Sequence, residues 1–509
     1  MTVILFTASL LIPLVTGILL AFLFCPSLRT GGAGRVFGFF AGSGLGLGIA
    51  SCLAFLCLLA GVTRYLPVVD LGVGLFVGVG WFIVSRWHAV GKDRSLPETG
   101  RRSSFQTLLA GIFSLELVAS AASFALAFLK EPHGRWDAWL IWNMHARFLF
   151  RGGDHWRDAF ASGLDWSHWD YPLLLPLAIA RSWNYLGGES LPVPAVIAGL
   201  FTFLTLGLLF ASLALLRSRS QGYLAAMILM GTPFFIALGA SQFADVPLAL
   251  FILTTLVLLL SQARSAEGRR GALVLAGCAA GLCAWTKNEG LLFLLVATMG
   301  LFGTTFHAGG GKEACRRTAA FLAGALPVFL IVCHFKLRIA PANDLVAGFS
   351  MVTLSDKLLD WGRYGAIARA FLLMGTSFTQ GLVDVRVGMQ FNPGVVNILL
   401  LIAYLLFAGI RIDRPDRTGL LTISAVLCIM PAGYFLVYVM TPLDLAYHLT
   451  TSLNRLFLQL WPSLILLIFM IAQTPEERFP PNGASVTVPP LGQSRPQKRK
   501  KQQRNQEVK

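Results

Sequence analysis

A polar, tryptophan-rich segment at residues 130–190 interrupts an otherwise apolar chain and holds the first candidate for proton transfer. Asp137 follows Trp136 near the start of this segment, just after the apolar run 105–129 has ended. A carboxylate in a partly dry environment can accept a proton from a nucleophilic hydroxyl or amine. Residues 136–154 also fit an amphipathic helix that only anchors the loop at the membrane surface. Asp137 is therefore a candidate general base, with interfacial anchoring as the alternative.

Two cations, Lys287 and Arg455, stand at the borders of apolar runs, on the side of the membrane that we infer below to be exported. Because positive charge is disfavoured there, each cation needs an anionic partner, and a lipid phosphate is the natural candidate. Solvated or snorkelling side chains are the alternative interpretation. Asp245 begins a further apolar run two residues before Pro247, which is typical of a side chain that caps a helix N-terminus.

The elements that must position these residues are membrane helices. The chain has 509 residues, of which 55% are hydrophobic and 13% charged, and its mean hydropathy is +0.68. Apolar runs of roughly 20 residues recur throughout, and only helices satisfy their own backbone in such runs inside a bilayer. We predict an all-α polytopic membrane protein with about 13 transmembrane helices. The expected spans are 3–24, 36–62, 66–85, 105–129, 191–216, 221–240, 245–262, 271–286, 290–306, 318–335, 394–410, 419–440 and 455–473.

The distribution of cations predicts the orientation of the bundle. Six cationic loops alternate along the chain and are all expected to be cytoplasmic; they contain Arg29 and Arg35, Arg86 to Arg102, Arg217 and Arg219, Arg264 to Arg270, Lys312 to Arg317, and Arg411 to Arg417. The same parity places residues 130–190, residues 337–393 and a short turn at 441–454 on the exported side. None of the eight cysteines lies in the two long exported loops, so no exported disulfide is expected.

Two local patterns predict how particular helices are used. A surface helix is expected in each part of the first exported loop, at 136–154 and at 173–186, where prolines flank the second apolar stretch. Small residues repeat from Gly42 to Gly48, which predicts close packing of that span against another helix.

The order of these motifs resembles the polyprenyl-phosphate-dependent GT-C glycosyltransferases. The shared order is an apolar span, an exported loop with an Asp-led amphipathic stretch, an aromatic-Pro-Leu turn, the sequence SxxADVPLA from Ser241 and the sequence WTKNEG from Trp285. The branch containing protein O-mannosyltransferases and the lipid A aminoarabinose transferase is the most similar. The resemblance covers residues 105–289, with a weaker match around Arg455.

Carried over residue by residue, the resemblance implies a site assembled from several loops. It makes Asp137 the catalytic carboxylate and Asp170 a second candidate, and it gives Asp245 a structural role. Lys287, Arg455 and His448 would bind the donor phosphate, while Trp136, Trp139, His168, Tyr171 and Glu289 would line the sugar or acceptor pocket. The family often has Asp-Glu at the position of Asp137-Ala138 and Lys-Pro-Pro at the position of Asp170-Tyr171-Pro172. These departures leave the acceptor undetermined and a divalent metal optional, since no ligand spacing requires one.

The resemblance also implies a division of the chain. Residues 1–104 form an N-terminal three-helix membrane extension, and 105–336 a GT-C-like catalytic core that includes the first exported loop. A second exported loop at 337–393 and C-terminal membrane helices at 394–473 follow. Residues 474–509 are expected to be a disordered basic cytoplasmic tail that contacts anionic membrane lipids. The net charge of +16 therefore indicates a membrane and not a nucleic-acid partner.

The chemistry favours a transferase over a glycosidase. A sugar leaving a lipid phosphate needs one base and some cations, because the departing phosphate is already a stable anion, whereas a glycosidase needs two carboxylates. We expect an inverting glycosyltransferase of the bacterial inner membrane that takes a polyprenyl-phosphate-linked sugar to a periplasmic or cell-surface glycan or lipid. A lipid or solute transporter or flippase is the alternative class, and a non-catalytic assembly subunit is a third.

Overall fold

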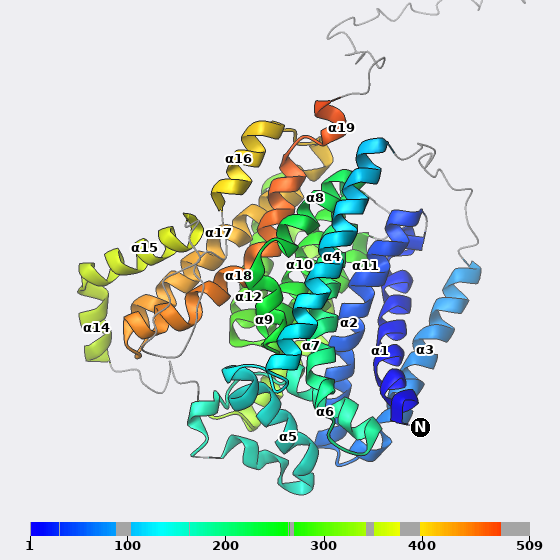
Figure 1. The fold of residues 1–509 in the computed structure, drawn as a ribbon, viewed down its shortest axis with the longest axis vertical. Helices are drawn as coiled ribbons and strands as arrows, with labels where there is room; N and C mark the ends of the chain where they lie inside the picture. Colours follow the sequence, from blue (N-terminus) through cyan, green and yellow to red (C-terminus); the bar gives the residue numbers. More distant parts are fainter. Residues whose placement is uncertain are drawn as a thin grey trace, which may run out of the picture.

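The protein is helical throughout the part described by the computed structural model. This part comprises residues 2–29, 31–87, 103–161, 163–262, 264, 269–342, 351–376 and 398–479. No strand occurs within these ranges, where a single isolated bridge pairs Ile410 with Ala472. The predicted all-α class is confirmed, and most of the helices run side by side as a bundle (Figure 1).

The helices of the bundle follow one another along the whole chain. They are α1 (Thr2–Phe24), α2 (Gly32–Leu59), α3 (Leu66–Trp87), α4 (Ser104–Lys130), α5 (Asn143–Arg151), α6 (Leu174–Leu186), α7 (Pro192–Leu216), α8 (Arg219–Met230), α9 (Pro233–Ala240), α10 (Asp245–Ser261), α11 (Arg269–Thr286), α12 (Asn288–Arg338), α14 (Met351–Leu359), α15 (Trp361–Thr376), α16 (Ile398–Ala408), α17 (Arg417–Met440), α18 (Leu445–Ile471) and α19 (Pro475–Arg478). A π-helix, Ala138–Trp142, directly precedes α5.

Eight helices of the described chain are long and apolar enough to cross a membrane, or nine if one bent pair is a single span. The predicted count of about 13 is therefore not confirmed. The difference has five sources: α8 and α9 meet at a 66° bend, α10 and α16 have only 17 and 11 residues, α11 is not among the candidate spans, and α12 joins two helices at Gly310, whose φ is 77°. The predicted spans 290–306 and 318–335 lie on either side of that break.

Helix α10 forms the centre of the bundle. Its side chains are buried from Asp245 to Leu260, and it packs against α7, α11 and α18. A helix that is apolar all round is stable only when other helices cover every face. Asp245, its first residue, is consequently brought into the protein interior.

The first three helices pack against α6, which is not the surface helix that its flanking prolines predicted. Ten consecutive residues of α6 are buried, and the helix contacts α1, α2, α3, α5 and α7. Its one buried charge, Arg181, is neutralised by Asp70 of α3, with Nη2 to Oδ2 at 2.6 Å. Helices α1 and α2 approach so closely that a Cβ on Gly46 would overlap the Pro13 carbonyl, which confirms the packing predicted from the small-residue repeat.

Helix α18 begins within the segment 441–454 that was expected to be a turn, ten residues before the predicted start of the last span at 455. Its first residue is Leu445, and Asp444 caps it by accepting a hydrogen bond from the Tyr447 N–H at 2.8 Å. Arg455 therefore lies well inside the helix, whereas the prediction placed it at the start of the span. The polar composition of residues 445–454 concealed this beginning. In the predicted second exported loop, α14 and α15 are described, whereas residues 343–350 and 377–397 lie outside the described part.

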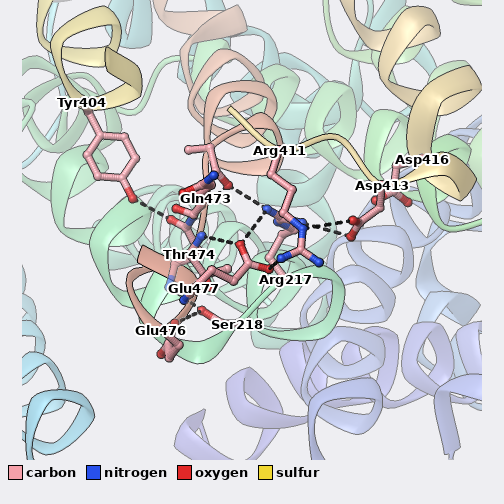
Figure 2. A network of polar contacts seen from close by, with 12 residues as sticks. Arg217, Ser218, Tyr404, Arg411, Asp413, Asp416, Gln473, Thr474, Glu476 and Glu477 are labelled. Atoms are coloured by element: carbon pink, nitrogen blue, oxygen red, sulfur yellow. Dashed lines mark hydrogen bonds and ion pairs between the residues drawn. The ribbon is translucent and has the colours of Figure 1, made fainter. Parts of the chain in front are cut away.

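A polar network joins several helix ends at one end of the bundle, near α16 and α19 (Figures 1 and 2). Arg217 is its centre: its guanidinium donates to the Ala472 carbonyl at 2.7 Å and pairs with Asp413 at 3.1 Å. Arg411 pairs with Glu477 at 3.0 Å. This end collects cations that were predicted to be cytoplasmic, while α5 and α6 lie at the opposite end. The first residues of the predicted disordered tail 474–509 are ordered instead, because Thr474 caps the short helix α19 in a capping box, whereas residues 480–509 fall outside the described part.

Candidate functional site

A buried carboxylate at the start of α10 holds the two cations that the sequence singled out. Asp245 accepts hydrogen bonds from Lys287 Nζ at 2.9 Å, from Arg455 Nε at 3.0 Å and Nη2 at 2.8 Å, and from Gln459 Nε2 at 2.7 Å. Ala244 takes the N-cap position, so Asp245 is not the N-cap residue, although it lies in the first turn near the positive end of the helix dipole, as predicted. Asp245 instead joins α10 to α18 and to the turn between α11 and α12.

Arg455 extends this cluster to the first exported loop. Its Nη1 lies 2.7 Å from Asp137 Oδ2, while the rest of the guanidinium is held by Asp245 and faces the Phe243 ring at 4.9 Å. The side chains of Arg455 and Asp137 are 12% and 17% exposed, whereas that of Asp245 is fully buried. The Asp137–Arg455 pair is thus more open to a ligand than Asp245 is.

The position of Asp137 depends on the short connection between α9 and α10. Gln242, in the left-handed region with φ 63°, donates from Nε2 to the Pro132 carbonyl at 3.1 Å and accepts from Asn143 Nδ2 at 2.8 Å. Gly134 also has a positive φ of 75°, and a Cβ there would lie 2.7 Å from the Ser241 carbonyl oxygen. Only glycine allows this approach, which docks the start of the loop beside Asp245.

Lys287 is deeper than Arg455 and is held by two carboxylates. Its side chain is 4% exposed, and Nζ lies 2.9 Å from Glu289 Oε1 as well as from Asp245 Oδ1. Burial alone would lower the pKa of Lys287, but Asp245 and Glu289 outweigh burial and the net shift is upward. Lys287 is therefore a permanent positive charge of the cluster. Glu289 Oε2 is buried and has no hydrogen-bond partner among the described residues.

Asp170 belongs to a second, adjacent ion pair. It is buried, accepts from Asn288 Nδ2 at 2.7 Å and lies 3.1 Å from Lys336 Nζ, which also donates to Asn288 Oδ1 at 2.7 Å. Asp170 is connected to the site through Asn288, which lies between Lys287 and Glu289 in the sequence. Asp170 is not part of the Asp137–Arg455 ion pair. Lys336 was missed in the sequence, although it follows the predicted span 318–335 as a cation on the exported side, the same signal that identified Lys287.

Tyr171 is the middle ring of an aromatic stack that covers Lys287. Its ring lies 4.9 Å from that of His168 and 5.5 Å from that of Trp142, at interplanar angles of 11° and 19°. Lys287 Nζ is 5.8 Å from the Tyr171 centroid. Burial raises the pKa of Tyr171 well above its usual value, so its phenol stays neutral.

Three other predicted residues are placed outside the central cluster. Trp136 and Trp139 are 59% and 52% exposed and stack on each other at 6.3 Å. His448 lies 2.9 Å from Thr441 Oγ1 through Nδ1 and packs edge-on against Tyr438 at 4.8 Å. No hydrogen bond or ion pair joins His448 to Asp245, Lys287 or Arg455, all of which the structure describes.

The charged side chains of the cluster pair with one another and, in the part of the chain that the structure describes, are not arranged as metal ligands. Asp137, Asp245 and Glu289 contribute three negative charges, against two positive charges from Lys287 and Arg455. Within the described ranges, no group of three or more His, Cys, Asp or Glu side chains is arranged to hold a metal ion. The carboxylates of the cluster are already paired with Lys287 and Arg455, and the cluster carries one net negative charge.

Residues 170–337, about one third of the chain, match the family model described as dolichyl-phosphate-mannose-protein mannosyltransferase. This segment contains Asp170, Asp245, Lys287 and Lys336, but neither Asp137 nor Arg455. The match supports the GT-C resemblance and with it a membrane glycosyltransferase, whereas the branch within that superfamily is not resolved by it. No curated protein and no solved structure matches the chain significantly.

Proposed function

We propose that this protein transfers a sugar from a polyprenyl-phosphate donor to a hydroxyl or amine of an exported glycan or lipid. The observation that carries the proposal is the shared guanidinium of Arg455, which holds the accessible Asp137 and the buried Asp245 at once. Asp137, the candidate base, is thus hydrogen-bonded to Arg455, the residue proposed to bind the phosphate.

In the proposed reaction, Asp137 takes the proton from the acceptor hydroxyl or amine while that atom attacks the anomeric carbon. The bond from the anomeric carbon to the phosphate oxygen breaks, and its electron pair leaves with the prenyl phosphate. Attack from the side opposite to the leaving group inverts the anomeric centre. The leaving group needs no proton because phosphate is a stable anion, and Arg455 stabilises the charge that develops on it.

The ion pair also suggests how donor binding prepares the base. A donor phosphate at Arg455 competes with Asp137 for Nη1, because a guanidinium binds phosphate and carboxylate oxygens by the same geometry. Asp245 keeps Nε and Nη2 in place during this exchange. Release of Asp137 from Arg455 then leaves its carboxylate able to accept the acceptor proton. Lys287 lies deeper than Arg455 and partly neutralises the negative charges of Asp245 and Glu289.

The assignments of the remaining residues follow from this geometry. Asp170 is proposed as a support of the site through Asn288, and His448 as a residue at its margin. The exposed rings of Trp136 and Trp139 are proposed to contact the sugar or acceptor. The site would face the exported side of a bacterial inner membrane, with the Arg217 network and the C-terminus on the cytoplasmic side.

Replacing Asp137 by Asn tests the proposal. The purified protein is placed in lipid nanodiscs with radiolabelled polyprenyl-phosphate sugars, together with membrane glycans and lipids as acceptors. The wild type should transfer label, and Asp137→Asn should lower the rate at least about 100-fold because the base is lost. Asp154→Asn, an exposed carboxylate of the same loop, is the matched control and should retain activity. Equal rates for wild type and Asp137→Asn would remove Asp137 from the mechanism.

The same protein preparation distinguishes a glycosyltransferase from a transporter. A transporter would move the lipid-linked donor across a liposome membrane and leave the bond between sugar and phosphate intact. Movement of the donor without transfer of label by the wild type would favour the transporter over the glycosyltransferase.

A further inference from the structure

A cavity lies at the predicted first exported loop, beside the segment that carries Asp137. Its volume is about 260 Å³, and its polar and aromatic lining comes from His133, Asn143, Arg147, Trp183, Glu189 and Ser190. These residues belong to the start of the loop, to α5, to the end of α6 and to the connection from α6 to α7. None of the charged or hydrogen-bonding residues of the Asp245 cluster lines it.

Asn143 presents an acceptor without a partner in this lining. The chain of hydrogen bonds starts at the Pro132 carbonyl, which can only accept, so the contacting atom of Gln242 is its donor Nε2 and the other is the acceptor Oε1. Asn143 must then donate from Nδ2 to Gln242 Oε1, as it also does to the His133 carbonyl at 3.1 Å. Its Oδ1 is left buried, with no hydrogen-bond partner in the described part of the chain. A buried acceptor of this kind costs free energy unless a donor reaches it.

The charged part of the lining is neutral in sum. Arg147 Nε lies 3.5 Å from Glu189 Oε2, and both side chains remain partly exposed, at 33% and 23%. The spacing of 3.5 Å is long for a direct hydrogen bond, so Arg147 keeps donors for a further partner, whereas Glu189 is also held by Arg151, which donates from Nη2 to Oε2 at 2.8 Å. Trp183 is buried, and its indole N–H is already used by the Ser190 carbonyl at 3.1 Å. Trp183 therefore lines the cavity without a free hydrogen-bond donor.

These features together select the ligand by its chemistry. A guanidinium donor, a carboxylate acceptor, an unpaired amide acceptor and an aromatic ring suit a small, neutral molecule with several hydroxyl groups and one apolar face. A pyranose sugar has that combination. A phosphate would meet Glu189, and an apolar chain would leave Asn143 and Arg147 unsatisfied.

We propose that this cavity is a subsite for one sugar unit of the acceptor. Asn143 is six residues after Asp137 on a continuous helical segment, so the two Cα atoms are separated by about 9 Å along the axis, roughly the length of one or two sugar rings. An acceptor glycan with its reactive hydroxyl at Asp137 thus has its neighbouring sugar within reach of the cavity. The proposal rests on the proposed transferase function for its biological role, but the sugar site itself can be measured without transfer.

The test measures binding of methyl glycosides of mannose, glucose and galactose to the full-length protein in nanodiscs by ligand-observed NMR, with glycerol as a polyol control. At least one glycoside should bind, and Arg147→Met should weaken it about tenfold or more because a charged donor is lost. Arg151→Met is the matched control: Arg151 also pairs with Glu189, at 2.8 Å from Nη2, but does not line the cavity. Arg151→Met should bind the glycoside with an affinity within about threefold of wild type. Asp137→Asn should also bind it normally, even though transfer is lost.

The binding results either support or overturn the sugar subsite. Glycoside binding that is lost in Arg147→Met and kept in Arg151→Met supports the subsite even if no transfer is observed, so failure of the proposed function remains distinguishable. No glycoside binding by the wild type, binding equal to that of glycerol, or equal losses in both arginine variants would overturn the subsite and assign the cavity to water. A loss in Arg147→Met that extends to the polyprenyl-phosphate sugar itself would overturn the assignment to the acceptor.

Discussion

Arg455 combines two contacts that have different consequences when they are lost. Its bonds to the fully buried Asp245 support the fold, because a buried carboxylate without a partner is strongly unfavourable. Its bond to the partly exposed Asp137 contributes less stability, since solvent competes for both groups. A substitution that keeps one bond and loses the other should therefore separate folding from catalysis.

Arg455→Lys is expected to make this separation. A single ammonium can stay with Asp245 but cannot also hold Asp137 and a phosphate by a planar fork. We expect kcat/KM for the donor to fall about 100-fold, with a thermal midpoint close to wild type, as measured by transfer assays and by unfolding in detergent. Arg157→Lys, an exposed arginine of the first exported loop, serves as the control. An unchanged kcat/KM in Arg455→Lys would contradict the phosphate role.

His145 gives the first exported loop a dependence on pH. Burial, followed by the nearby His168, lowers its pKa to about 4, and Asp170 only partly opposes this. The unfolded chain binds a proton near pH 6.5 and the folded loop only near pH 4, so stability is fully present above pH 6.5 and is lost as the pH falls toward 4. The loss should approach roughly 3 kcal/mol if the loop unfolds with the rest of the protein. Thermal unfolding between pH 7 and 4 should show it, and His145→Phe should remove most of the slope; an equal slope in the variant would place the titration elsewhere.

At the scale of elements, α6 connects the N-terminal helices to the site. Asp170 and Tyr171 lie just before α6, and α6 is held in place by Arg181, which bonds Asp70 of α3 through Nε at 2.9 Å and Nη2 at 2.6 Å. Tyr185 donates to the same Asp70 oxygen at 2.7 Å. The N-terminal extension, for which the sequence indicated no role, therefore covers the helix that follows the site.

Breaking this ion pair should destabilise the protein more than replacing it. Asp70→Leu leaves the Arg181 guanidinium buried and uncompensated, at a cost of about 3–5 kcal/mol. The double variant Asp70→Leu with Arg181→Met replaces both charges by apolar groups and should recover most of that loss. The thermal midpoints of the single and double variants in detergent check the expectation. A double variant no more stable than Asp70→Leu would show that packing, and not the unpaired charge, sets the cost.

At the scale of the whole molecule, the two ends of the bundle carry different chemistry. The Arg217 network joins the ends of α7, α17 and α18 through bonds such as that to the Ala472 carbonyl, while the Asp245 cluster joins the start of α10 to the middle of α18. Helix α18 runs between them and carries Arg455. In the proposed orientation, the cations at the first end lie on the cytoplasmic side and the candidate site lies on the exported side.

This orientation can be checked with an existing thiol. Cys315 is exposed and lies between Glu313 and Arg316 in a predicted cytoplasmic loop, whereas Asp154 is exposed in the first exported loop. In intact spheroplasts, a membrane-impermeant maleimide should label Asp154→Cys and leave Cys315 unlabelled. Inverted vesicles should show the reverse pattern. Labelling of Cys315 from outside would reverse the proposed topology.

The sequence by itself determined the helical membrane class and most candidate residue types, because runs of apolar residues can satisfy their backbone only as helices and because charges among them require partners. It indicated Asp137, Lys287 and Arg455 through their positions next to such runs, but it concealed the start of α18 and the ion pair of Lys336. Only the tertiary structure decided that Asp245 binds both cations and that α6 is buried. Arg455 and Asp245 are 210 residues apart in sequence, and no local pattern encodes a contact whose geometry depends on how α10 and α18 pack.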